Sequence, residues 1–157
     1  MCIRDSSKFE EWLKRLESAE LFAFDTETTS LDYSKAQIVG VSFAVTAGSA
    51  AYVPFGHNYP DAPQQLNREE ILDKLRPLLE NPAQTKLGQN LKYDAHILAN
   101  HGITLRGIAH DTMLESYVLN STLTKHNMDD LAKEYLGVTT ITSVSYTHLT
   151  LPTKRIV

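Results

Sequence analysis

The sequence predicts an α/β fold, in which one sheet carries an antiparallel hairpin at one edge and strand–helix units at the other. An apolar run at residues 21–24 leads into an acidic stretch that ends at Asp32, as expected for a buried central strand. A segment rich in β-branched residues, 37–45, and a second strand candidate, 50–55, flank the turn Ala47-Gly48-Ser49. Short strand candidates then alternate with helical stripes, which is typical of βα units.

Local patterns predict the elements of the N-terminal half. Residues 1–6 (MCIRDS) predict no element. Ser7 and Glu10 form a capping pair, and apolar residues follow at helical spacing, namely Phe9, Trp12, Leu13 and Leu16. Residues 21–26 predict the first strand. Residues 37–45 and 50–55 predict the antiparallel hairpin, in which Pro54 ends the pairing or marks an edge.

Capping residues predict the helices of the C-terminal half. Asn67 and Glu70 precede a leucine-rich stripe that ends at Asn81-Pro82. Residues 86–89 and 108–109 are short strand candidates. We expect three further helices, capped by Asn90, Asp111 and Asn127, of which the first ends at Gly102 and the last at Gly137.

Composition limits the function classes. The chain has 157 residues, 42% hydrophobic and 22% charged, which predicts one globular domain without membrane contact. We also expect the protein to be a monomer. Cys2 is the only cysteine, so we expect no internal disulfide and a cytoplasmic location. The net charge is −4, so a nucleic-acid role requires local positive charge, bound cations or a neighbouring domain.

Three acidic residues are the candidate catalytic residues. Asp25 and Glu27 lie on one side of the first strand, roughly 6.6 Å apart. An isolated Asp-x-Glu pair is most often a polar strand exit. Asp94, however, lies one turn into a helix after another strand, and parallel pairing would bring it near that pair. Such carboxylates favour Mg²⁺ or Mn²⁺, and two metal ions support hydrolysis of a phosphodiester.

Three longer segments carry a family resemblance. FAFDTETTSLD, LGQNLKYDAHILANHGI and HDTMLESYVLNS resemble, in this order, the proofreading 3′–5′ exonuclease domains of bacterial DNA polymerase I. These belong to the DEDD exonucleases, and the likeness extends over roughly residues 9–142. It implies a ribonuclease H-like fold, a mixed five-stranded sheet with helices on both faces. It also implies a C-terminal polymerase domain in the parent protein and a single-stranded 3′ DNA end as substrate.

The resemblance also assigns roles to residues. Asp25, Glu27 and Asp94 match metal ligands of the family, which implies two divalent ions, Mg²⁺ or Mn²⁺. Thr28 and Leu31 resemble residues that border the terminal nucleotide. The residues that resemble the lining of the single-stranded 3′ end are Gln89, Asn90 and Tyr93, and the last is suited to stack on a base or a sugar.

One family motif is missing. The family has a later Tyr-x-x-x-Asp motif, which supplies a fourth carboxylate and a water-orienting tyrosine. No tyrosine of this chain has Asp four residues later, and no carboxylate side chain follows Glu134. We therefore expect a truncated exonuclease domain at residues 7–143, without its last helices and inactive or nearly so. Residues 1–6 and 144–157 resemble translated sequencing-adapter read-through and are expected to be non-native.

Two other functions suit parts of the same sequence. The same carboxylates and fold suit a ribonuclease D-like RNA exonuclease, and the missing motif suits a non-catalytic scaffold of a polymerase. The six histidines match no zinc motif. Asp111 is interpreted as a helix cap rather than a catalytic acid. The candidates for contacts with a nucleic-acid backbone are Lys92, Arg106 and Lys125.

Overall fold

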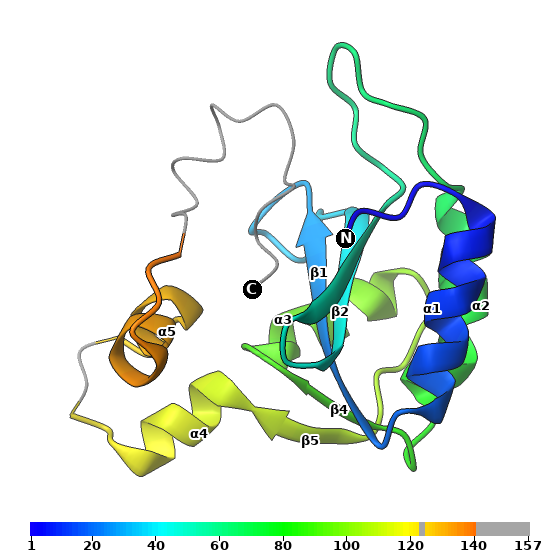
Figure 1. Cartoon of the computed structure of the whole chain (residues 1–157). Helices are drawn as coiled ribbons and strands as arrows, with labels where there is room; N and C mark the ends of the chain where they lie inside the picture. Colours follow the sequence, from blue (N-terminus) through cyan, green and yellow to red (C-terminus); the bar gives the residue numbers. More distant parts are fainter. Residues whose placement is uncertain (123–124, 141–157) are drawn as a thin grey trace.

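A computed structural model describes residues 1–122 and 125–140 of the chain. Five strands form one mixed sheet in the order β3-β2-β1-β4-β5. Their bounds are Leu21–Thr28 (β1), Ile38–Thr46 (β2), Ser49–Pro54 (β3), Thr85–Gly88 (β4) and Ile108–Asp111 (β5). The hairpin β2–β3 is antiparallel, β1 pairs antiparallel with β2, and β4 and β5 continue the sheet in parallel (Figure 1). The predicted α/β class and its mixed five-stranded sheet are confirmed.

The helices begin close to their predicted caps. They are α1 (Ser6–Ser18), α2 (Arg68–Glu80), α3 (Leu91–Asn100), α4 (Thr112–Leu119) and α5 (Met128–Leu136). Figure 1 shows α1 and α2 side by side, while α4 and α5 extend from the β5 edge. One start was wrong: Asp5, not Ser7, caps α1, and its carboxylate accepts a hydrogen bond from the backbone N–H of Lys8.

The two faces of β1 differ in chemistry. Phe22 and Phe24 are buried, and both rings contact Phe43 of β2. Apolar side chains of α1, α2 and α3 join these rings in one core. Since side chains alternate along a strand, Ala23, Asp25 and Glu27 lie on the opposite face, where each is half-buried. The core therefore fixes β1 and directs its acidic side chains away from the three helices.

The first residues of the chain pair with β3, although the sequence predicted no element there. The backbone N–H of Tyr52 donates to Met1 O, and that of Ile3 donates to Tyr52 O, both at 2.8 Å. The N-terminal ammonium donates to Ala50 O. Ile3 is fully buried in the core. Residues 1–3 thus cover the outer edge of β3.

Lys86 is a buried lysine of β4. Its side chain is fully buried, and its Nζ donates to Asn81 O at 2.9 Å and to Gln84 O at 2.8 Å. Burial disfavours the charged form and lowers the pKa of Lys86 to about 8.

This buried lysine predicts a pH-dependent stability. Between pH 8 and the ordinary lysine value of 10.5, the unfolded chain holds a proton that the folded chain has lost. Stability should therefore rise with pH in this window, by at most about 3 kcal/mol. Urea unfolding of the parent and of Lys86→Met across this range measures the effect. Lys92→Met, at an exposed lysine of α3, should keep the parent's pH profile, and an identical profile for Lys86→Met would contradict the prediction.

Within the described ranges, 1–122 and 125–140, the structure contains no helix with the length and hydropathy needed to cross a membrane.

Candidate active site

Asp25 and Glu27 share the face of the sheet that lies opposite the phenylalanine core. Asp25 pairs with Ser42 of β2, and Glu27 pairs with Gly40. Their positions two residues apart on β1 direct both carboxylates to the same side. The predicted placement of Asp25 and Glu27 on one side of the strand is therefore found in the structure.

Tyr52 of β3 reaches toward these carboxylates. It pairs with Ser42, so its side chain lies on the same face as Asp25. Its ring covers Gly40: a Cβ built on that glycine would lie 2.1 Å from the Tyr52 hydroxyl. Because Gly40 has no side chain, the Tyr52 ring can lie over it, and Gly40 is the residue that pairs with Glu27.

The environment of Tyr52 shows how acidic this face is. Burial raises the pKa of Tyr52, and the negative charges of Glu27 and Asp25 raise it further. His57 Nε2 forms a hydrogen bond with the tyrosine hydroxyl, and burial lowers the pKa of His57. A neutral phenol bonded to an imidazole therefore lies beside the acidic pair. No local sequence pattern indicates this contact, because the register of β3 against β2 creates it.

Asp94 of α3 is buried and faces β1. The backbone N–H and the Oγ1 of Thr26 both donate to Asp94 Oδ1, at 2.8 and 2.6 Å. Burial raises the pKa of Asp94, the two bonds from Thr26 oppose that rise, and the negative charge of Asp111 adds to it. Asp94 therefore lies next to β1, as predicted. It contacts Thr26, the residue between Asp25 and Glu27.

The three carboxylates are not gathered around one point. Within the described part of the chain, no group of three or more His, Cys, Asp or Glu side chains is close enough to hold a metal ion. Asp25 and Glu27 share one face of β1, whereas Asp94 is bonded to Thr26, whose side chain lies on the other. The structure brings the helix to the strand but does not preassemble the three ligands.

Asp111 organises the starts of two helices. Its Oδ1 accepts hydrogen bonds from the backbone N–H groups of Met113 and Leu114, which caps α4 as predicted. The same carboxylate accepts bonds from the backbone N–H groups of Asn90 and Leu91 at the start of α3. Asn90 lies at the predicted N-cap position of α3. Its backbone is left-handed, with φ of 59°, and its side chain makes no capping bond.

Gln89 joins neighbouring elements beside Asn90. Its Nε2 donates to His126 O at 2.7 Å, and its Oε1 accepts a hydrogen bond from Thr112. The segment before α5 is thereby attached to the start of α3.

Tyr93 contacts the loop that follows β1. Its hydroxyl donates to Ser30 O at 2.6 Å and shares a 2.7 Å hydrogen bond with Thr28 Oγ1. Leu31, the next residue of the loop, is 94% exposed. The structure thus brings Tyr93 and Thr28 together and leaves the side chain of Leu31 projecting from the surface.

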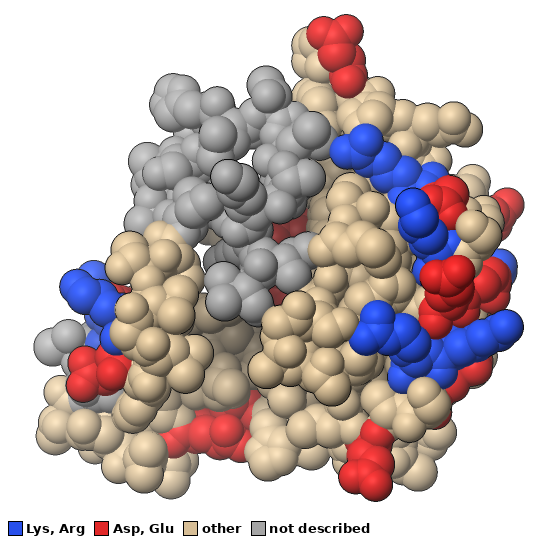
Figure 2. Space-filling view, in the orientation of Figure 1, with Lys and Arg blue, Asp and Glu red and all other residues tan. Residues whose placement is uncertain are grey.

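Charges of both signs alternate over α1 and α2. Figure 2 shows this face, where lysine and arginine lie among acidic side chains. Lys74 pairs with Glu10, and Arg76 pairs with Asp73 and Glu80. Of the predicted nucleic-acid contacts, Lys92 is exposed on α3, Arg106 precedes β5, and Lys125 pairs with Asp130 at 3.9 Å.

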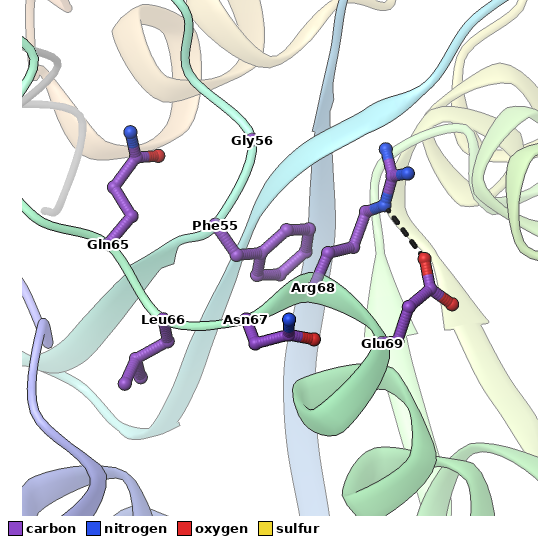
Figure 3. A pocket seen from close by; sticks show the side chains of 7 residues that line it. All are labelled: Phe55, Gly56, Gln65, Leu66, Asn67, Arg68 and Glu69. Carbon is purple, nitrogen blue, oxygen red and sulfur yellow. Dashed lines mark hydrogen bonds and ion pairs between the residues drawn. The ribbon is translucent and has the colours of Figure 1, made fainter.

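Among the described residues, two hollows have linings that do not include Asp25 or Glu27. One, of about 610 Å³, is bordered by Phe55 and by residues 65–69, and Figure 3 shows Arg68 beside it, paired with Glu69 at 3.2 Å. The other, of about 850 Å³, lies between α4 and α5. Its walls are mainly apolar and include exposed Leu114, Val118 and Leu119.

A mixed sheet in this order, with an acidic pair on its central strand and a further carboxylate on the helix after the parallel neighbour, defines the class of ribonuclease H-like nucleases. Within that class, the chain belongs to the 3′–5′ exonuclease family. The model of the family described as 3′-5′ exonuclease matches residues 1–152.

Curated relatives support this membership. The chain is 59% identical over 141 residues to DNA polymerase I of Pseudomonas aeruginosa. This alignment covers 88% of the chain and 15% of the relative. The chain is 38% identical over 156 residues to DNA polymerase I of Rhizobium leguminosarum, with the same coverage of 88% and 15%. The chain thus spans about 15% of the length of these relatives.

Solved structures confirm the fold. The structure of the POL domain of Pol1 from M. smegmatis, in complex with DNA primer-template and dNTP, has a TM-score of 0.70 and 22% identity, covering 92% of this chain and 24% of that one. Escherichia coli RNase D has a TM-score of 0.66 and 16% identity, covering 92% of this chain and 35% of its own. Brucella melitensis NrnC with bound Mg²⁺ has a TM-score of 0.61 and 21% identity, and the match covers 80% of this chain and 57% of that one. Exonucleases of this kind generally use divalent metal ions.

Proposed function

We propose that the chain is the proofreading exonuclease portion of a bacterial DNA polymerase I. In this role, it removes 3′-terminal nucleotides from DNA by phosphodiester hydrolysis, next to a C-terminal polymerase domain that serves replication and repair. The observation that carries the proposal is the acidic face of β1 in a chain 59% identical to a DNA polymerase I. The proposed bounds of this domain are residues 7–143, and the foreign origin of 1–6 and 144–157 stays a prediction.

Asp25, Glu27 and Asp94 are the proposed ligands of two divalent ions, Mg²⁺ or Mn²⁺. Their donors are all carboxylate oxygens, which these hard cations prefer. Asp25 and Glu27 also share one face of β1, which brings two such donors to the same side of the strand. Such ions supply an activated water and stabilise the leaving oxygen. Both hydrogen bonds to Asp94 use Oδ1, which fixes the carboxylate against β1.

The remaining site residues are proposed to hold the single-stranded 3′ end. Thr28 and Leu31 border the terminal nucleotide, and Leu31 offers an exposed apolar surface to a base. Gln89 and Asn90 lie where α3 begins, and the Asn90 carboxamide is not used for capping. Tyr93 presents its ring, while its hydroxyl is bonded to the loop after β1.

The missing Tyr-x-x-x-Asp motif limits the proposed activity. The chain retains an acidic pair and Asp94, but no tyrosine is followed four residues later by Asp. Positioned acid–base groups contribute roughly 10²–10⁴-fold to rates, so the chain as written is expected to be nearly inactive. Processive digestion of single-stranded DNA by the pure chain would contradict this.

A ribonuclease D-like RNA exonuclease is the second candidate. The fold similarity to Escherichia coli RNase D favours it, but the 59% identity to a DNA polymerase I favours the first. A non-catalytic scaffold is the third, and the presence of Asp25, Glu27 and Asp94 argues against it for the parent protein.

Mn²⁺ titration by calorimetry tests the proposed metal site. The parent chain should bind Mn²⁺, and Asp25→Ala should weaken that affinity at least about 10-fold, since removal of even an outer partner commonly costs 10- to 100-fold. Asp73→Ala, at an exposed acid on α2, is the matched control and should leave the affinity unchanged. Equal affinities in all three proteins, with unchanged circular dichroism, would reject Asp25 as a ligand.

A further inference from the structure

The loop after β1 is closed by its own hydrogen bonds. We define the Leu31 loop as residues 29–37. At its ends, the backbone N–H of Thr29 donates to Gln37 O, and that of Gln37 donates to Thr29 Oγ1, both at 3.1 Å. In its middle, Asp32 Oδ1 accepts hydrogen bonds from the backbone N–H and hydroxyl of Ser34. These bonds give the loop a defined shape.

Helix α3 holds this loop along one of its faces. Tyr93, His96 and Asn100 are spaced three and four residues apart, so they form a stripe on the helix surface. Besides the bond of Tyr93 to Ser30 O, the His96 ring stacks on Tyr33 at 4.6 Å between centroids and 19° between planes. Asn100 Nδ2 donates to Tyr33 O at 2.6 Å. The stripe therefore contacts the loop on both sides of Leu31.

Leu31 stands between these attachment points. Ser30 is bonded to Tyr93, and Tyr33 is held by His96 and Asn100. The Leu31 side chain nevertheless remains 94% exposed. A large apolar side chain on a loop attached on both sides is suited to contact a flat apolar group, such as the face of a terminal base.

We propose that Tyr33, His96 and Asn100 are positioning residues that hold the Leu31 loop against α3 and so present Leu31 to the 3′-terminal base. The inference rests on the proposed exonuclease function. A loop fixed before binding loses less conformational freedom when the DNA end arrives, which increases affinity. Tyr93 contributes through its hydroxyl, so its contact with the loop adds to the contact proposed for its ring.

Hydrogen exchange of the free protein tests the attachment itself. His96→Ala removes the stack on Tyr33 and should increase the exchange of backbone amides in residues 29–37 by roughly 3- to 10-fold. His96→Phe keeps a flat ring and should restore the parent's protection. His110→Ala replaces an exposed histidine on β5, paired with Glu115, and is the matched control. Unchanged loop exchange in both His96→Ala and Asn100→Ala would overturn the inference.

Terminal-base fluorescence tests the presentation of Leu31. The probe is a short single-stranded oligothymidylate that ends in 3′ 2-aminopurine. In titrations followed by the fluorescence of this base, Leu31→Ala and His96→Ala should both weaken the binding of the probe by roughly 3- to 10-fold. His96→Phe should behave as the parent does.

The outcomes distinguish the two proposals. If the parent binds the probe and Leu31→Ala weakens binding while His96→Ala does not, the inference fails and the proposed function stands. If the parent fails to bind the probe at all, the proposed nucleic-acid function fails together with the role of Leu31, whatever the exchange data show.

Discussion

Asp111→Ala is expected to lower the free energy of unfolding by roughly 2–4 kcal/mol, since each helix cap contributes up to about 2 kcal/mol. The buried carboxylate accepts hydrogen bonds from four backbone N–H groups, two at the start of α3 and two at the start of α4. Alanine leaves all four without this acceptor. The loss should also disturb the start of α3, and with it Asn90 and Asp94.

Urea unfolding followed by circular dichroism measures this effect. Asp5→Ala is the matched control, because Asp5 is an exposed cap that serves only α1. That change should cost about 1 kcal/mol. Asp111→Asn retains an oxygen acceptor and should fall between the alanine variant and the parent. Equal losses for Asp5→Ala and Asp111→Ala would show that the bonds to α3 contribute nothing.

Gly107→Ala is expected to destabilise the chain by about 3 kcal/mol, the scale of an overpacked site combined with a strained backbone. Gly107 precedes β5 with a φ of 69°, and a Cβ there would lie 2.4 Å from the backbone oxygen of Gln84. Gln84 O also accepts the Lys86 ammonium, so the chain cannot move away without disturbing that bond. Steric contact and backbone strain therefore add.

Gly102→Ala separates these two contributions. Gly102 has a similar φ of 68°, but no atom lies within 4 Å of its Cβ position. Only the left-handed backbone is penalised there, at a cost of about 1 kcal/mol. The same urea titration gives both values. If the two variants lost the same free energy of unfolding, the segment around Gln84 would have moved to accommodate the new methyl group, which would contradict the prediction.

Patterns local in sequence predicted most of the fold. The apolar run at residues 21–24 predicted the buried strand β1, and the alternation of side chains predicted that Asp25 and Glu27 share one side of it, as found. The leucine stripe of α2 and the caps Asn67 and Asn127 were also correct. These features depend on neighbours within a few residues, which the sequence displays directly.

Features made by long-range contact were not predictable. Asp111 lies twenty or more positions from the two amides of α3 that it binds. The position of the Tyr52 ring over Gly40 depends on the register of β3 against β2. The sequence placed Asp94 near β1 through the expected parallel pairing, but its bonds to Thr26 required the three-dimensional packing of α3. Acidic residue type thus indicated the chemistry, while orientation came from packing.

The pairing of residues 1–3 with β3 has a consequence for association between molecules. An exposed edge strand offers free backbone groups on which a strand from another chain can add. At Tyr52, both the N–H and the carbonyl that face outward are occupied by Met1 and Ile3, and the ammonium of Met1 binds Ala50 O. The pairing of residues 1–3 therefore protects β3 at Tyr52 against sheet extension.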